Sequence, residues 1–152
     1  VSLALMLFGV ATVIGNLLGG RLADRLGTRR ALQSVLVGLA FSLAALSLTT
    51  NHVGPMFANL FAWGIFAFAI SPIVQAGVVA TAEVEAPDAV GTASGFNIAA
   101  FNLGIAVASF IGGILVAGPG LRATPWAAVV AALIALGIVW HIGRTERRVA
   151  TS

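Results

Sequence analysis

The chain has no cysteine and very little charge, and each shortage excludes a class of protein. Without cysteine, neither disulfide bonds nor thiolate metal sites can form. Only 9% of the 152 residues are charged, whereas 59% are hydrophobic. A soluble domain needs about a quarter of its residues charged to cover its surface. Most of this surface must therefore face lipid, which makes the bilayer the first predicted partner of the chain.

Groups that could catalyse a reaction are also scarce. The five acids lie between or after the apolar runs, and His52 and His141 stand at the ends of runs. We find no nucleophile–base pair, metal-ligand cluster or phosphate-binding loop, so we predict a protein that is not an enzyme and uses neither metal nor cofactor. A carboxylate within an apolar run, the usual proton carrier in a membrane, is missing too. In a proton-coupled parent, that group would lie in another part of the carrier.

Five apolar runs are long enough to cross a hydrocarbon core of about 30 Å, which takes roughly 20 helical residues. Strands are a poor alternative, because the runs do not alternate and an open sheet edge cannot lie in lipid. We predict an all-α integral membrane protein whose five helices form a single transmembrane bundle over residues 1–152. The expected spans are approximately 1–20, 31–49, 54–82, 89–117 and 125–142.

The basic residues are concentrated in two places. Four of the eight lie in a predicted loop at 21–30, and three more lie in the tail at 144–152. The pI near 11.5 could suggest nucleic-acid binding, but clusters at the ends of apolar runs are not a basic face, so we predict no nucleic-acid partner. The positive-inside rule places both clusters in the cytoplasm and leaves Arg122 outside.

The charged segment also carries a motif. Residues 20–30 read Gly-Arg-Leu-Ala-Asp-Arg-Leu-Gly-Thr-Arg-Arg. This pattern resembles the signature loop of the major facilitator superfamily of transporters, which joins the second and third helices of a six-helix bundle. The resemblance implies a cytoplasmic gate, in which Asp24 and Arg25 belong to a charge-relay cluster that latches one half of the carrier to the other. The predicted gating residues are Gly20, Asp24, Arg25, Gly27, Arg29 and Arg30.

The fourth run contains small residues at repeated spacing. Gly95, Gly104 and Gly112 belong to a stripe that would let a neighbouring helix approach closely, so we predict a role in helix packing. The segment 96–104 resembles the eleventh helix of bacterial sugar and drug efflux carriers. This likeness assigns the chain to helices eight to twelve, in the carboxy-terminal half, and the missing amino-terminal half becomes a predicted partner. A placement as helices two to six stays open.

Several amide side chains lie within the runs. An amide in hydrocarbon needs a hydrogen-bond partner, so each one should face either another helix or a water-filled cavity. For any single residue, a hydrogen bond between helices is the simpler reading. As candidates for a solute-lining cavity we select Gln75, Asn97 and Asn59.

These observations predict a secondary active transporter of the bacterial inner membrane that exports sugars or drug-like small molecules by alternating access. The chain begins at Val1 without an initiator methionine and has an odd number of spans, so we expect a fragment that does not transport alone. A small integral membrane protein that assembles with, or regulates, other helices is the alternative.

Overall fold

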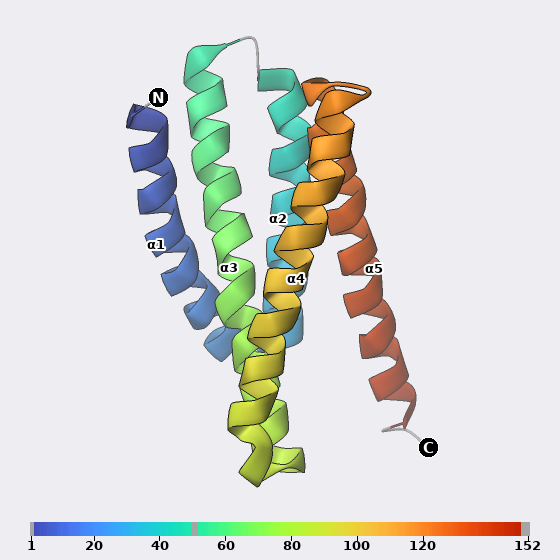
Figure 1. Cartoon of the computed structure of the whole chain (residues 1–152). Coiled ribbons are helices and arrows are strands. Elements are labelled where there is room, and N and C mark those ends of the chain that lie inside the picture. Colours follow the sequence, from blue (N-terminus) through green and yellow to red (C-terminus); the bar gives the residue numbers. More distant parts are fainter. Residues whose placement is uncertain (1, 50–51, 150–152) are drawn as a thin grey trace.

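The computed structural model describes residues 2–49 and 52–149, and its architecture is a group of five long helices (Figure 1). No strand occurs in these residues. Each long helix contains a segment long and apolar enough to cross a membrane, which confirms the predicted fold class. The helices are α1 (Ser2–Leu26), α2 (Thr28–Thr49), α3 (Val53–Glu85), α4 (Val90–Ala117) and α5 (Thr124–Val149), with short 3-10 turns η1 (Pro87–Ala89) and η2 (Leu121–Ala123).

Apart from Gly27, the segment 21–30 is helical, so the predicted loop was wrong. α1 continues to Leu26 and α2 begins at Thr28, which leaves Gly27 alone between them. Gly27 has a φ of 75°, in the left-handed region that glycine adopts without a steric penalty. Its amide still donates to the Ala23 carbonyl at 3.0 Å. Arginine, leucine and alanine are good helix formers, so the charged residues extend the two helices instead of interrupting them.

A row of small residues on α1 brings this helix against α3. Ala11, Gly15, Gly19 and Ala23 recur at every fourth position, and all four are buried. A methyl group on Gly19 would run into the main chain of Ala69 on α3. Small residues at this spacing let two helix backbones approach closely. The most extensive helix contact in the described bundle is that between α1 and α3, which our sequence analysis did not single out.

The buried core lies where α1, α2 and α3 meet, near the Gly27 turn. Association inside a membrane depends on close packing, because lipid tails are as apolar as the side chains themselves. Small and branched side chains accordingly fill this centre, with Ile73 and Val35 the largest of those fully enclosed. The core residues are Ala23, Ala31, Val35, Ala69 and Ile73.

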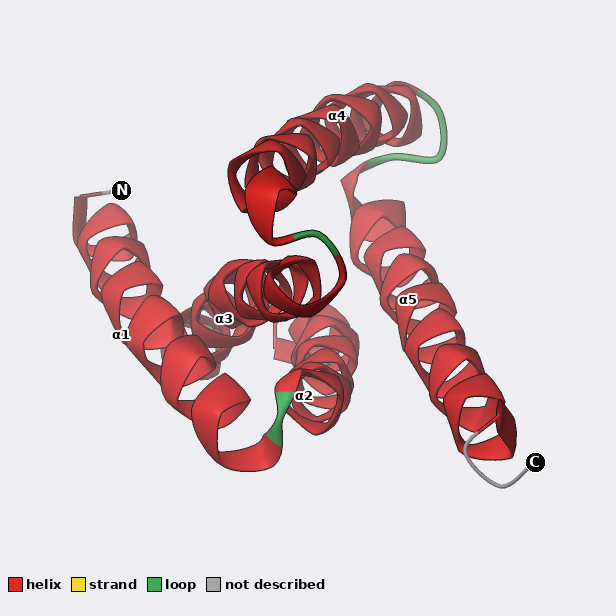
Figure 2. Ribbon diagram, turned by 90° about the horizontal axis from the view of Figure 1, so that it is seen from below, coloured by secondary structure: helices red, strands yellow, loops and turns green. Residues whose placement is uncertain are grey.

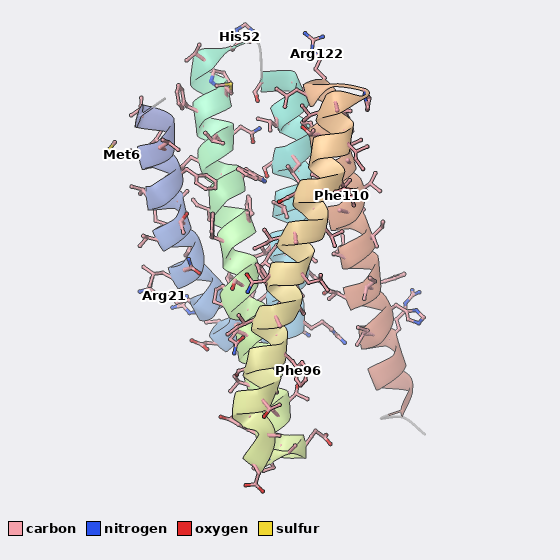
Figure 3. All side chains as sticks on the ribbon, viewed as in Figure 1. Met6, Arg21, His52, Phe96, Phe110 and Arg122 are labelled. Atoms are coloured by element: carbon pink, nitrogen blue, oxygen red, sulfur yellow. The ribbon has the colours of Figure 1, made fainter. Side chains whose placement is uncertain are left out.

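The last two helices are attached differently. α5 packs along α2, whereas α4 stands apart from the other helices, as the end-on view shows (Figure 2). α4 contacts α3 near the connection between them, and it has few contacts with α5. None of its described residues is buried. Phe96 and Phe110 on α4 project away from the bundle (Figure 3), with exposed fractions of 73% and 71%.

Candidate functional site: a polar contact between α3 and α4

A tight connection folds the start of α4 back beside the end of α3. The amide of Ala86 donates to the Ala82 carbonyl at 2.9 Å, and the Ala86 carbonyl accepts from the amide of Ala89 at 2.9 Å. Pro87 occupies the first position of η1, where its missing N–H is not needed. Residues equally far from this connection lie opposite each other on the two antiparallel helices.

Gln75 and Asn97 are such a pair, since Gln75 precedes Ala86 by as many residues as Asn97 follows it. The Asn97 Nδ2 donates to the Gln75 Oε1 at 2.6 Å, and the Gln75 Nε2 donates to the Ser94 Oγ at 2.8 Å. Ser94 and Asn97 are three residues apart, so they share one face of α4. We call these three residues the α3–α4 polar cluster. The structure thus brings together two of the three predicted cavity residues and adds Ser94, which sequence reasoning missed.

The cluster keeps hydrogen-bonding capacity after these two bonds are made. Each amide has two N–H donors and a carbonyl oxygen with two lone pairs, and the serine hydroxyl both donates and accepts. All three side chains are half-buried, so they are not enclosed by the described helices. The cluster is neutral, and it offers donors and acceptors side by side on one surface.

Asn59 lies elsewhere. Its Nδ2 donates to the Ser42 carbonyl at 3.0 Å and to the Thr49 Oγ1 at 3.4 Å, which ties α3 to α2 near the end of the bundle opposite the Gly27 turn. The cavity role predicted for Asn59 stays a prediction. The contact that the structure does provide is the hydrogen bond between helices that we gave as the simpler reading.

A cavity of about 950 Å³ lies near the Gly27 turn, and it is lined by residues of α2, α3 and α5 and by Ala93 at the start of α4. Its lining is mostly aliphatic, with Thr28, Arg29 and Glu85 among the polar residues. None of the three residues of the α3–α4 polar cluster lines it. Because adjacent helical residues point about 100° apart, the cavity beside Val74 and the cluster at Gln75 occupy different faces of α3.

Arg29 ties the start of α2 to the end of α5. Its Nη1 donates to the Gly143 carbonyl at 3.0 Å, across 114 positions in the sequence. Gly143 is buried, and a methyl group at that position would overlap the Arg29 guanidinium. The motif predicts only a gating role for Arg29. A glycine between the fifth run and Arg144 was the one sign of this contact in the sequence, and it did not indicate a partner.

The remaining motif residues face outward. Asp24, Arg25 and Arg30 are exposed, and the structure gives the Asp24 carboxylate no hydrogen bond or ion pair with the rest of the described chain. The Asp24–Arg25 charge relay is therefore not formed within these residues, and the gate stays a prediction. Gly20, also assigned to the gate, has no neighbour within 4 Å of an added methyl group.

The glycines predicted to pack α4 have no close neighbour in the described structure. A methyl group on Gly95, Gly104 or Gly112 would meet nothing within 4 Å. Gly104 and Gly112 instead line an apolar groove of about 740 Å³ between α4 and α5. Their packing role stays a prediction that these residues do not test.

Charge is distributed unevenly along the bundle. Arg21 lies at the end that holds the Gly27 turn, whereas His52 and Arg122 lie at the opposite end (Figure 3). Between the ends, apolar helices of membrane length carry the neutral α3–α4 polar cluster. This arrangement is that of a helical membrane protein with polar side chains in contact between two of its spans.

Comparison with known sequences identifies the family. The sequence model of the Major Facilitator Superfamily matches residues 1–152, so the chain belongs to this family of transporters, and the resemblance seen at residues 20–30 is confirmed. No solved structure gave a significant match.

Three curated relatives show the same membership. The chain is 37% identical to the uncharacterized MFS-type transporter YtbD of Bacillus subtilis over 91% of its length. It is 36% identical to the inner membrane transport protein YdhP of Escherichia coli over 96% of its length, and 31% identical to a probable sugar efflux transporter of Mannheimia succiniciproducens over 91%. The matched regions cover 34%, 36% and 33% of those proteins. The chain therefore spans about a third of their length.

Proposed function

We propose that this chain supplies helices eight to twelve of a secondary active transporter that exports sugars or drug-like small molecules by alternating access. The observation that carries the proposal is the hydrogen bond between Gln75 and Asn97, at 2.6 Å, because it places a neutral polar site between two spans of a transporter-family bundle. One of the relatives described above is a probable sugar efflux transporter, which supports export. The five helices would form one wall of the solute site.

The proposed location is the bacterial inner membrane, with the Gly27 turn and the carboxyl terminus in the cytoplasm. Seven arginines then lie inside and Arg122 lies outside, as the positive-inside rule requires. A cysteine at Thr28 should be protected from an impermeant thiol reagent in intact cells, and one at Ala123 should react. Reaction at Thr28 from outside would reverse the orientation and remove the basis for a cytoplasmic gate.

The proposed gate uses Asp24 as a contact between halves of the carrier. Its carboxylate is exposed and makes no hydrogen bond or ion pair with the described chain, so it is available to a group on another part of the protein. Arg29 has a different task, since it holds the Gly27 turn to α5 through the Gly143 carbonyl. The turn would then move with α5 as one unit when the carrier changes its conformation.

Transport by the full product of the gene tests the proposal. Purified product in liposomes should exchange at least one labelled sugar or drug-like compound across the bilayer, and residues 1–152 alone should not. The reading frame upstream of Val1 should encode about seven further spans. A gene that encodes this chain alone, with no solute exchange, would favour the small integral membrane protein that assembles with other helices.

A further inference from the structure

We propose that the α3–α4 polar cluster, formed by Gln75, Ser94 and Asn97, binds a neutral hydroxyl-bearing solute of the sugar class. This inference rests on the proposed transport function and specifies its substrate. It selects sugars over drug-like cations, a choice that family membership leaves open. Three observations support it: the absence of charge in the spans, the chemistry of the cluster's hydrogen bonds, and its half-buried position.

The first argument is charge. A charged solute in a site of low dielectric needs a fixed group of opposite sign, because an unpaired ion is strongly disfavoured there. In the third of the relatives' length that this chain spans, no such group stands beside the cluster. Asp, Glu, Lys and Arg are all absent from residues 2–20, 31–49, 53–82, 90–117 and 124–142.

The second argument is the chemistry of the existing bonds. Asn97 donates to Gln75 at 2.6 Å, and Gln75 donates to Ser94 at 2.8 Å. A hydroxyl group can enter between Asn97 and Gln75, because it accepts from an N–H and donates to a carbonyl oxygen at once. One amide–amide bond is then replaced by two bonds to the solute. An ammonium group has donors only, so it would leave the Asn97 N–H unpaired.

The third argument is position. Ser94 and Asn97 are the two residues of α4 whose side chains hydrogen-bond to another helix in the described structure, and all three cluster residues keep an open side. They lie one helical turn apart, about 4.5 Å along the axis of α4. A sugar ring presents several hydroxyls on one edge and can meet both positions together.

The first experiment measures which solutes are exchanged. The full product of the gene is reconstituted in liposomes, and counterflow is followed with radiolabelled glucose, arabinose and lactose and with tetraphenylphosphonium. We expect saturable counterflow of at least one sugar and none of the cation. Exchange of the cation without any of the three sugars would overturn the inference and leave the transport function standing. Exchange of none of the four would count against both.

Variants then locate the site. Asn97→Ala and Gln75→Leu should each raise the half-saturating sugar concentration by about twofold to tenfold, the usual effect of losing one neutral hydrogen bond. Asn102→Ala is the matched control, because Asn102 is an exposed amide on the same helix without a described hydrogen bond. Its half-saturating concentration should match the parent. Equal effects of Asn97→Ala and Asn102→Ala would overturn the assignment.

Deoxy analogues separate binding from a structural role, since they change the solute and leave the protein intact. Among the singly deoxygenated forms of the exchanged sugar, one should bind the parent protein about twofold to tenfold more weakly than the full sugar does. The Asn97→Ala variant should bind this analogue and the full sugar with equal affinity. A purely structural cluster would give independent losses that multiply for every analogue, and that result would overturn the proposal.

Discussion

Two helices of this chain carry small residues at helical spacing, and they behave in opposite ways. On α1, Ala11, Gly15, Gly19 and Ala23 are buried against α3. On α4, glycines of the same kind have no neighbour within 4 Å of an added methyl group. The spacing of small residues therefore shows which face of a helix another backbone can approach closely. It does not show which helix, if any, packs against that face.

The physical reason is that small residues make close packing possible without supplying a partner. In lipid, helices associate through packing and hydrogen bonds rather than through the hydrophobic effect. α1 has a face of small residues and also a neighbouring helix, since α3 runs beside it through the core around Ile73 and Ala69. α4 has such a face too, but its side-chain bonds to the bundle come from Ser94 and Asn97.

The largest difference in stability is expected between Gly19→Leu on α1 and Gly104→Leu on α4. In the 152-residue chain, Gly19→Leu should lower the free energy of unfolding in detergent by about 1–3 kcal/mol, because the new side chain must displace the α3 backbone. Gly104→Leu should leave it unchanged or raise it slightly, since that position is open and leucine is a better helix former than glycine. Circular dichroism during titration with a denaturing detergent gives both values.

The same two variants can also be compared in the full product of the gene. There, Gly104→Leu should also reduce the yield of folded protein, if the predicted packing of the α4 stripe is correct. Equal losses from both variants in the short chain would contradict the packing described for α1 and α4. A normal yield of the Gly104 variant in the full product would show that the stripe faces lipid.

A smaller effect is expected on α5, where two glycines differ in the same way. Gly143→Ala places a methyl group against the Arg29 guanidinium, whereas Gly137→Ala meets nothing within 4 Å. Alanine favours a helix over glycine by about 1 kcal/mol, so Gly137→Ala should be neutral or stabilising. Gly143→Ala should fall below it by about 1.5 kcal/mol, the lower value for a hydrogen bond from a charged group, because the methyl group would move the Arg29 guanidinium away from the Gly143 carbonyl. Matching unfolding curves would mean that Arg29 moves aside without cost.

The smallest energetic effect belongs to an exposed residue, Asp24. Asp24→Asn should change stability by no more than about 0.3–1 kcal/mol, the usual value of a surface charge near a helix end. It should nevertheless slow transport by the full product, if the carboxylate pairs with another part of the carrier. Glu83→Gln is the control, because Glu83 is an exposed acid outside the motif. Equal transport by both variants and the parent would reduce Asp24 to a bystander.

Much of the bundle could be predicted from the sequence, and the errors occurred where local signals conflict. The charged residues at 21–30 suggested a loop, yet helix-forming side chains carry α1 to Leu26 and let α2 begin at Thr28. Gln75, Asn97 and Asn59 were selected for the same reason, as amides in apolar spans. Gln75 and Asn97 hydrogen-bond to each other, whereas Asn59 hydrogen-bonds to α2. The difference depends on how far each residue lies from the turn between its helix and the next, and not on its chemistry.

The sequence by itself determined the number of spans, the membrane class and the family, because hydropathy and the motif at 20–30 are local properties of consecutive residues. The tertiary structure decided which small residues are buried, that Ser94 joins Gln75 and Asn97, and that Arg29 reaches a carbonyl 114 positions away. Such contacts depend on the register between antiparallel helices and on which helices lie side by side. No short window of sequence contains that information, because one residue's difference in register turns a helical side chain by about 100°.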